Sequence, residues 1–282
     1  MAIKTFISVL ELREALRETY ALSKKVGFVP TMGALHEGHL SLFREVKSQC
    51  DYVVASIFVN PKQFGANEDF SSYPRTLKED LAKLERLGVD AVFIPNAKEM
   101  YPDGFQTYVF NKDMSKVLCG QFRPDHFQGV LTVVMKLLNM VQPDIAIFGR
   151  KDYQQLQIIK TMVRDMNMPI EVKGADIVRE DDGLAMSSRN VRIDESHRPE
   201  AKRIFEGLSK AKSLFNSGQR SVNALIEEFQ ASLSGSPFEL QYAEIRDQVH
   251  LEEFAKEVDK PAVLAVAAFL GDVRLIDNIE LG

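Results

Sequence analysis

The fold of this chain is decided by one stretch, Val26-Gly-Phe-Val-Pro-Thr-Met-Gly-Ala-Leu-His-Glu-Gly-His-Leu-Ser-Leu42. It opens with a short apolar run that ends at Pro30 and Thr31, and a segment containing Gly33 follows. Apolar residues then recur at roughly helical spacing, at Leu40, Phe43, Val46 and Cys50. This order predicts a strand, a glycine-bearing loop and a helix.

Two histidines stand where this helix is expected to begin. His36 and His39 are three positions apart, which places them on one face of the helix. Free backbone N–H groups and the positive end of the helix dipole meet at the same point and favour an anion. The imidazoles add N–H donors, and Gly38 lets a flat or bulky ligand approach the backbone. The pattern therefore indicates a site for a nucleotide phosphate.

Simpler interpretations of the same residues remain open. Paired histidines can bind a metal ion, but the zinc-protease pattern has a spacing of four, and no third ligand lies nearby in the sequence. Gly33 can serve only the turn, and either histidine can be an ordinary hydrogen-bonded polar group.

Composition sets the broad class of the protein. A chain of 282 residues can bury a substantial core and is expected to form two domains. Its apolar content of 45% and charged content of 27% are typical of a globular protein, and a net charge of −5 argues against broad nucleic-acid binding. Only Cys50 and Cys119 are present, which gives no disulfide framework and fits a reducing cytoplasm. No signal peptide is apparent, and no run approaches the ~18 apolar residues of a membrane span.

Strand and helix patterns alternate over the first two thirds of the chain. Strands are expected at residues 52–59, 89–94, 144–148 and 170–178, and helices at 8–22, 76–87, 129–141 and 153–166. The inner stripe of the second of these helices is expected at Leu77, Leu81, Leu84 and Leu87. This alternation predicts an α/β fold with a mostly parallel, doubly wound sheet that is covered by helices on both faces.

Ligands of such sheets lie beyond the carboxyl ends of the strands. Polar segments follow the expected strands at residues 31–39, 60–64, 149–155 and 179–190. We therefore expect these four segments to converge on one site.

The character of the chain changes after a polar segment, Arg179-Glu-Asp-Asp-Gly-Leu-Ala-Met-Ser-Ser-Arg-Asn190. Helical patterns over about 194–215 and 220–233 are followed by strand patterns at 238–245, 262–269 and 273–279. We expect residues 1–178 to form the nucleotide-binding domain, 179–190 a hinge and phosphate-contacting loop, and 191–282 a smaller C-terminal α+β lid domain.

Several side chains on the polar segments suit a nucleotide site, although each also has a simpler interpretation. Lys151 can place an ammonium on a phosphate and Asp152 can accept from a ribose hydroxyl, but the first can be a solvated charge and the second a helix cap. Met186-Ser-Ser-Arg-Asn190 offers hydroxyls and a guanidinium, or is merely a linker.

Two neutral side chains suit a small substrate that carries hydroxyl and carboxylate groups. Gln63 and Gln155 can each donate and accept hydrogen bonds, although a single glutamine is more commonly a surface residue. Arg123-Pro-Asp-His126 adds positive charge or forms a plain turn. No Walker-type loop or Gly-x-Ser-x-Gly elbow is present, and the scattered carboxylates do not suggest a glycosidase.

Taken together, the motifs resemble a known family. His36-Glu-Gly-His39 resembles the His-x-Gly-His signature of the nucleotidyltransferase superfamily, which includes the class I aminoacyl-tRNA synthetases. The set becomes specific for the pantothenate synthetase (pantoate–β-alanine ligase) family through four further motifs that occur in order: Phe58-Val-Asn-Pro-Lys-Gln-Phe, Tyr73-Pro-Arg-Thr, Phe148-Gly-Arg-Lys-Asp-Tyr-Gln-Gln and Gly183-Leu-Ala-Met-Ser-Ser-Arg-Asn.

The resemblance implies a Rossmann-like nucleotide-binding domain and an AMP-forming carbon–nitrogen ligase. Such an enzyme condenses (R)-pantoate with β-alanine through a pantoyl adenylate and releases AMP and pyrophosphate. The family also implies a homodimer in the cytoplasm, with small-molecule substrates and no nucleic-acid or membrane partner.

The same resemblance assigns roles to individual residues. The residues expected to act on the ATP phosphates, with His39 also a proton donor, are His36, His39, Lys151, Ser187 and Arg189. Those expected to line the ATP site more widely are Met32, Gly33, Ala34, Leu35, Glu37, Gly38, Gly149, Arg150, Asp152, Val178, Met186 and Ser188. Gln63 and Gln155 are expected to bind pantoate, with Gln63 also near β-alanine.

Electrostatics is expected to contribute more than proton transfer to such a reaction. Adenylyl transfer gains mostly from positioning and from neutralising charge on the phosphate oxygens. Mg²⁺ is expected mainly on the ATP phosphates, and Asp80 is a weak candidate for an outer partner of the ion. Arg150 departs from the family pattern, so the sequence does not determine the net charge around the phosphates.

Two rival functions remain at the level of sequence. Another nucleotidyltransferase with the same histidine motif would act on a phosphate acceptor, and would need a basic acceptor pocket in place of the neutral Gln63 and Gln155. A catalytically silent nucleotide-binding module is the second rival, but the cationic and imidazole groups of an enzyme are all present.

Overall fold

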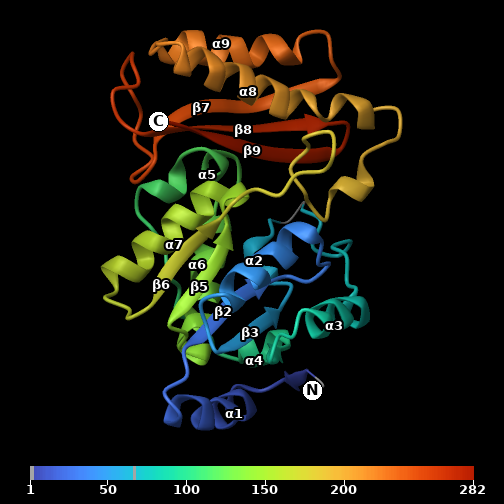
Figure 1. Cartoon of the computed structure of the whole chain (residues 1–282), viewed down its shortest axis with the longest axis vertical. Helices are drawn as coiled ribbons and strands as arrows, with labels where there is room; N and C mark the ends of the chain where they lie inside the picture. The colour runs from blue at the N-terminus through green and yellow to red at the C-terminus, as the bar shows by residue number, and fades with distance from the viewer. Residues whose placement is uncertain (1–2, 66–67) are drawn as a thin grey trace. The chain divides into compact units, whose positions relative to one another are not determined.

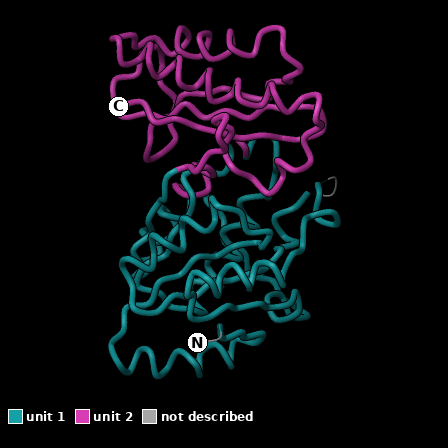
Figure 2. Tube along the Cα trace, turned by 45° about the vertical axis from the view of Figure 1, so that its right-hand side comes forward, with its two compact units in different colours: residues 1–116, 120–150, 158–176 teal, residues 117–119, 151–157, 177–282 magenta. Residues whose placement is uncertain are grey.

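The computed structural model describes residues 3–65 and 68–282 of the chain. The chain divides into two compact units (Figure 2): unit 1 comprises residues 1–116, 120–150 and 158–176, and unit 2 comprises residues 117–119, 151–157 and 177–282. The roles of hinge for residues 179–190 and of lid for 191–282 stay predictions.

Unit 1 is built from alternating strands and helices (Figure 1). Its strands are β1 (Lys4–Phe6), β2 (Val26–Thr31), β3 (Tyr52–Ile57), β4 (Ala91–Phe93), β5 (Ile145–Gly149) and β6 (Glu171–Ala175). Its helices are α1 (Val9–Ala21), α2 (Glu37–Lys47), α3 (Leu77–Arg86), α4 (Ala97–Met100) and α6 (His126–Val141), with 3₁₀ turns η1 (Pro61–Gln63) and η2 (Met114–Lys116). Three elements contribute residues to both units: α5 (Cys119–Phe122), η3 (Arg150–Asp152) and α7 (Tyr153–Asp165).

The described strands of unit 1 form one sheet in the order β1-β4-β3-β2-β5-β6, and every neighbouring pair is parallel. Helices cover both of its faces. Val29 of β2 packs with Phe43 and Val46 of α2 on one face. Phe28, whose side chain points the opposite way, is also fully buried, and α6 packs against β2 and α1. The predicted doubly wound parallel sheet is confirmed.

The strand order places a topological switch at β2. From β2 the chain proceeds through β3 to β4 in one direction, and then crosses over to β5 and β6 on the other side of β2. Ligands of doubly wound sheets bind in the crevice outside the carboxyl ends of the two strands at such a switch. In unit 1 these ends are Thr31 of β2 and Gly149 of β5. The strand order therefore selects the segments that follow these two residues.

Unit 2 contains an antiparallel sheet of β7 (Phe238–Asp247), β8 (Ala262–Leu270) and β9 (Val273–Leu281), in that order. Two helices, α8 (Arg203–Asn216) and α9 (Val222–Leu233), pack on it through a core that includes Leu208, Phe229, Leu264 and Val266. The 3₁₀ turns η4 (Asn190–Arg192) and η5 (Arg198–Glu200) precede α8. The predicted smaller α+β part is confirmed, although its first helix starts later than expected.

The late start of α8 has a local cause. Asp194 accepts hydrogen bonds from the N–H and the hydroxyl of Ser196, which forms a tight turn in place of a first helical turn. Pro199 then lies in η5 and lacks the N–H that a helix interior requires. The helix therefore begins at Arg203 and not near residue 194.

The inner face of α3 also differs from the prediction. Leu77 was expected to be buried but is 42% exposed, whereas Asp80 is fully buried. Leu84 is buried as expected, and Leu81 and Leu87 pack at the edge of the core. The periodicity failed at this position because α3 turns a carboxylate inward for a specific contact, described below. None of the helices in the described part of the chain combines the length and apolar character that a membrane crossing requires.

Candidate active site

The loop between β2 and α2 is held in an unusual conformation by α3. Gly33 and Ala34 both have left-handed backbone angles, with φ of 82° and 50°. Ala34 is strained in this region because it carries a Cβ. The Asp80 carboxylate accepts hydrogen bonds from the N–H groups of Ala34 and Leu35, each at 2.8 Å, and from the Thr76 hydroxyl at 3.3 Å. These contacts offset the strain and satisfy a carboxylate that would otherwise be costly to bury.

The two predicted histidines lie at the start of α2. His36 is the residue before the helix, and His39 is the third residue within it. Their ring centroids are 4.0 Å apart, and Nδ1 of His39 accepts a hydrogen bond from the His36 N–H at 3.3 Å. Because Nδ1 accepts, the neutral His39 ring carries its proton on Nε2. The Nε2–H group of His39 is thus a donor on a ring at the N-terminus of α2, where an anion is favoured.

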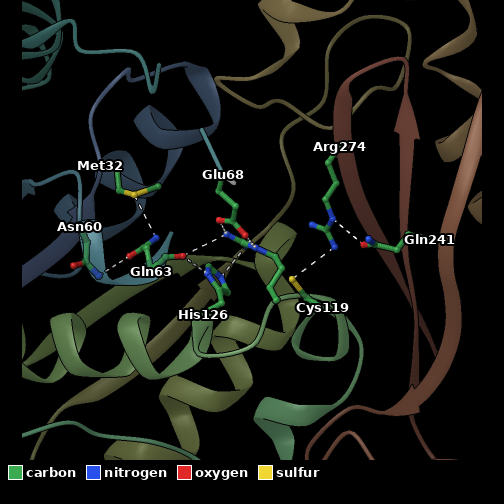
Figure 3. Close-up of polar contacts among 9 residues, drawn as sticks. Met32, Asn60, Gln63, Glu68, Cys119, His126, Gln241 and Arg274 are labelled. Atoms are coloured by element: carbon green, nitrogen blue, oxygen red, sulfur yellow. Dashed lines mark hydrogen bonds and ion pairs between the residues drawn. The ribbon is translucent and has the colours of Figure 1, made fainter. Parts of the chain in front are cut away.

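Gln63 lies in η1, on the loop that follows β3, and its amide has a defined orientation (Figure 3). Asn60 is almost fully buried. Its Oδ1 accepts from the Lys62 N–H at 3.2 Å and the Tyr101 hydroxyl at 2.8 Å, and its Nδ2 donates to the Gly129 carbonyl at 3.1 Å. A backbone N–H can only donate and a carbonyl can only accept, so the Asn60 amide cannot be reversed.

The orientation of Asn60 determines that of Gln63. Nδ2 of Asn60 also donates to Oε1 of Gln63 at 3.0 Å. The Gln63 nitrogen Nε2 is therefore directed to the Met32 sulfur at 3.3 Å. Since a thioether is a weak acceptor, a substrate oxygen would be a stronger partner for this N–H group. The Nε2 group of Gln63 is thus a hydrogen-bond donor directed toward Met32 in the β2–α2 loop.

The carboxyl end of β5 carries two of the predicted residues, Gly149 and Arg150. Gly149 pairs with Ala175 of β6, and Arg150 donates from Nε to the Gly174 carbonyl at 3.2 Å. Asp176 lies 3.7 Å from the same guanidinium but is almost fully exposed. Arg150 therefore binds the end of β6, which accounts for a charge that the sequence left unexplained.

In unit 2, Lys151 and Ser187 line the same pocket, together with Asn190, Arg274 and Asp277. The Lys151 carbonyl accepts from Asn278 at 3.0 Å, which ties the start of η3 to β9. Two residues predicted to bind phosphate are thus brought together within this unit.

Residues 178–190 form an ordered hairpin in unit 2. Met186 donates its N–H to the Val178 carbonyl at 3.0 Å, and Arg179 pairs with Ala185 in an antiparallel bridge. Ser187 Oγ accepts from the Arg189 N–H at 3.2 Å, which sets the turn on which Ser188 also lies.

A buried ion pair anchors this hairpin to β9. Arg179 contacts Asp277 through two hydrogen bonds of 2.6 and 3.0 Å, and its guanidinium stacks on Phe205 with 3.8 Å to the ring centroid. Burial raises the pKa of Asp277, and the hydrogen bonds and charge of Arg179 oppose that rise. Lys151 also lowers the pKa of Asp277, so the ion pair and the pocket lysine interact electrostatically.

The predicted site residues therefore fall into two sets. Unit 1 holds Met32, Gly33, Ala34, Leu35, His36, Glu37, Gly38, His39, Gln63, Asp80, Gly149 and Arg150. Unit 2 holds Lys151, Asp152, Gln155, Val178, Met186, Ser187, Ser188 and Arg189. Gln155 is half-buried on α7, while its neighbour Gln154 is buried and binds the backbone of Val117 and Cys119.

Sequence reasoning missed several residues that hold these sets in place. Asn60 precedes Pro61 at the start of η1, a position typical of a cap, and this signal could have identified it. The partnerships of Asp80 with Ala34 and of Arg179 with Asp277 left no local signal, because the partners are far apart in the sequence.

Comparison with known proteins extends over nearly the whole chain. The pantoate-beta-alanine ligase family model matches residues 4–280. Pantothenate synthetase of Thermosipho africanus is 48% identical over 277 residues, which cover 98% of this chain and 99% of the relative. A Pseudomonas putida protein of the same name is 49% identical over 281 residues, with 99% and 98% covered.

Solved structures of proteins with the same names are similar to this chain over nearly its whole length. The crystal structure of pantothenate synthetase from Thermus thermophilus has a TM-score of 0.92 and 42% identity, and covers 98% of this chain and 99% of its own. Pantoate-beta-alanine ligase from Francisella tularensis, complexed with beta-gamma ATP and beta-alanine, has a TM-score of 0.81 and 34% identity, with 99% and 97% covered. The chain belongs to the pantoate-beta-alanine ligase family.

Proposed function

We propose that this protein carries out the reaction for which its family is named, the ATP-dependent condensation of (R)-pantoate with β-alanine. The observation that carries this proposal is the match to the family over residues 4–280. The strand switch at β2 and β5, with paired histidines at the start of α2, supports a nucleotide site on the same chain.

The reaction proceeds in two group transfers. A carboxylate oxygen of pantoate attacks the α-phosphorus of ATP, the bond to the β,γ-phosphates breaks, and pyrophosphate leaves with the electron pair. The amine of β-alanine then attacks the carbonyl carbon of pantoyl adenylate, loses a proton, and displaces AMP. The oxygen that made the first attack therefore ends in AMP.

Residues of both units are proposed to act on the same ATP molecule. His36 and His39 from unit 1, and Lys151, Ser187 and Arg189 from unit 2, would donate hydrogen bonds or positive charge to the phosphates. Each such donor stabilises charge that grows on the oxygens during transfer, and the loss of one typically costs on the order of 10²–10³ in rate. Support for this role comes from the fixed Nε2–H donor of His39 and from the shared pocket of Lys151 and Ser187.

The nucleoside is proposed to lie against Gly149, Asp152, Val178 and Met186. The β2–α2 loop, from Met32 to Gly38, would give the phosphates access to backbone N–H groups at the α2 N-terminus. Asp80 supports this loop through its contacts with Ala34 and Leu35.

Pantoate is proposed to bind through Gln63 and Gln155. The donors that Gln63 directs to the side of Met32 suit the carboxylate and hydroxyl oxygens of pantoate. Neither glutamine carries charge, so the site has no built-in preference for a phosphorylated acceptor. This difference favours the ligase over a nucleotidyltransferase that acts on a phosphate.

Mg²⁺ is proposed to accompany ATP. Within residues 3–65 and 68–282 there is no group of three or more His, Cys, Asp or Glu side chains that could hold a metal ion. Mg²⁺ prefers substrate phosphate oxygens and water to an all-protein cage, so the ion is proposed to bind mainly to the ATP phosphates. The ion would neutralise phosphate charge. The Asp80 carboxylate is bound to the N–H groups of Ala34 and Leu35, so its proposed influence on the ion is indirect, through the position of the β2–α2 loop.

We also propose that the protein acts in the cytoplasm as a homodimer. The two cysteines, Cys50 and Cys119, are not joined in a disulfide, which suits a reducing compartment. Light scattering coupled to size-exclusion chromatography would test the dimer, and a monomeric mass would contradict it.

The test of the reaction is product detection by mass spectrometry. The purified chain with ATP, Mg²⁺, (R)-pantoate and β-alanine should yield pantothenate and AMP in equal amounts. Omission of pantoate should abolish AMP formation. Nucleotide transfer to phosphopantetheine without any reaction on pantoate would contradict the proposal.

A further inference from the structure

Polar contacts among Glu68, Arg123, His126 and the Gln63 carbonyl connect the loop that carries Gln63 to the segment that leads into α6 (Figure 3). Arg123 contacts the Glu68 carboxylate through Nε at 2.7 Å and Nη2 at 2.5 Å. Its Nη1 lies 3.1 Å from Nε2 of His126, and Nδ1 of His126 lies 2.8 Å from the Gln63 carbonyl oxygen. Arg123 also reaches that carbonyl with Nη2 at 3.5 Å.

The partners of His126 determine its protonation state. A carbonyl oxygen can only accept, so Nδ1 of His126 must carry a proton. A guanidinium can only donate, so Nε2 must be an unprotonated acceptor. The observed contacts therefore require the neutral Nδ1–H tautomer, because a proton on Nε2 would face the donor Nη1 of Arg123.

Two positive features near this ring, the Arg123 guanidinium and the N-terminus of α6, favour the same state. Arg123, at 3.1 Å, disfavours the imidazolium through like charge, and the N-terminus of α6 does so through its dipole. Glu68 opposes them, because its charge also interacts with His126, but its carboxylate is bound by Arg123. Burial alone would raise the pKa of Glu68, yet the hydrogen bonds and charge of Arg123 lower it. Glu68 therefore remains an anion across the range in which a histidine titrates.

The backbones of α6 and η1 are in close contact, which couples the network to Gln63. A Cβ added to Gly129 would lie 2.1 Å from the Lys62 carbonyl oxygen and 2.7 Å from the Gln63 nitrogen. Asn60 spans the same contact, since its Nδ2 binds both the Gly129 carbonyl and Oε1 of Gln63. Displacement of the first turn of α6 would therefore displace the Gln63 amide.

We propose that Glu68, Arg123 and His126 are positioning residues: the neutral Nδ1–H form of His126, maintained by Arg123, holds the Gln63 carbonyl and so directs the Gln63 side chain to pantoate. This role rests on the proposed function, in which Gln63 binds pantoate. The sequence alone is compatible with two roles for Arg123-Pro-Asp-His126, a source of additional positive charge or a plain turn. In the proposed role, Glu68 neutralises the charge of Arg123, and Arg123 and His126 together position Gln63.

A pH dependence with a definite sign follows. Protonation of His126 replaces the acceptor at Nε2 with a donor that opposes Arg123. Nδ1 keeps its proton, but the repulsion between Nε2–H and Arg123 displaces the ring, so the contact with the Gln63 carbonyl weakens as the pH falls. The KM for pantoate should therefore rise toward acid, while the KM for ATP should not follow it.

The kinetic test compares variants of the full-length chain at about pH 8 and about pH 6. His126→Ala removes the donor to Gln63 and should raise the pantoate KM about tenfold at pH 8, in line with the loss of one hydrogen bond and the freedom it restores. Glu68→Gln should raise it at both pH values by releasing Arg123. His126→Asn keeps an N–H donor near the Nδ1 position but cannot be protonated. It should restore the pantoate KM to within about threefold of wild type and abolish its rise toward acid.

His250→Asn provides the matched control, because His250 is an exposed histidine of unit 2. This variant should retain the wild-type pantoate KM and its pH dependence. An unchanged pantoate KM in His126→Ala, with wild-type turnover, would overturn the positioning role.

A spectroscopic readout separates this inference from the reaction itself. Nitrogen-15 spectra of the histidine rings should show the Nδ1–H tautomer for the signal that disappears in His126→Asn. An Nε2–H tautomer at that signal would overturn the proposal even if the enzyme is active. A wild-type chain that makes no pantothenate, but shows the Nδ1–H tautomer, would contradict the proposed function and the link to pantoate, while leaving the network itself established.

Discussion

Nδ1 of His39 accepts a hydrogen bond from the backbone N–H of His36 at 3.3 Å, and the two rings lie 4.0 Å apart. The first turn of α2 therefore fixes the neutral tautomer of His39 through the backbone. In this tautomer the Nε2–H group is a donor, as the proposed contact with a phosphate oxygen requires.

His39→Ala should abolish this donor and reduce adenylate formation about 10²–10³-fold. Pantoate-dependent exchange of pyrophosphate into ATP measures the loss. His39→Gln, whose amide reaches nearly as far as Nε2, should lose less activity. Because His39 is half-exposed, both variants should melt close to wild type. Near-normal exchange in His39→Ala would mean that another group stabilises the transferred phosphate.

Asp80→Asn should weaken the β2–α2 loop. One carboxylate oxygen becomes an NH₂ group that faces the N–H of Ala34 or Leu35, so a buried donor loses its acceptor. We expect a loss of about 1–3 kcal/mol in the free energy of unfolding, measured in urea, and a higher KM for ATP. The adjacent Glu79→Gln, on an exposed side chain, is the control and should change neither quantity.

Asn60→Asp should impair pantoate binding without a matching effect on ATP. The substitution keeps the acceptor for Lys62 and Tyr101 but removes the donor to Gln63 and to the Gly129 carbonyl. Gln63 is then no longer held with its nitrogen toward Met32. The pantoate KM should rise about tenfold or more. Tyr101→Phe removes only one contact with Asn60 and should have a smaller effect; equal effects would argue against control of the Gln63 amide by Asn60.

Asp277→Asn should destabilise unit 2. It leaves the partly buried Arg179 guanidinium without its counter-ion, and the loss of one partner of a buried pair typically costs up to about 3–5 kcal/mol. Because Asp277 also lines the pocket of Lys151 and Ser187, turnover should fall as well. Asp272→Asn, at an exposed position beside the same strand, should leave the melting temperature unchanged. Wild-type stability in Asp277→Asn would show that the ion pair does not anchor the hairpin.

The sequence was sufficient for the features that depend on local patterns. The apolar runs of β2, β3 and β5 and the helical periodicity of α2 correspond to the observed elements, because both faces of the sheet are covered and the patterns are strong. The position of His36 and His39 at a helix start also follows from residue order. The family motifs identified the pantoate-beta-alanine ligase family, which the comparisons confirm.

The supporting contacts could not be predicted from such patterns. Asp80 interrupts an otherwise apolar stripe because it binds Ala34, a residue 46 positions away. Arg123 and Glu68 are 55 positions apart, so nothing in either local sequence indicates their pairing. Contacts of this kind depend on the register between elements, and only the folded chain specifies that register.

The most direct test of the central claim follows the oxygen atoms of pantoate. The chain is incubated with ATP, Mg²⁺, β-alanine and pantoate labelled with ¹⁸O in both carboxylate positions, and the nucleotide product is analysed by mass spectrometry. Attack of the carboxylate on the α-phosphorus predicts AMP that carries one ¹⁸O atom, and pantothenate that retains the other. Formation of ADP together with ¹⁸O-labelled inorganic phosphate, or of AMP without the label, would contradict a pantoyl adenylate.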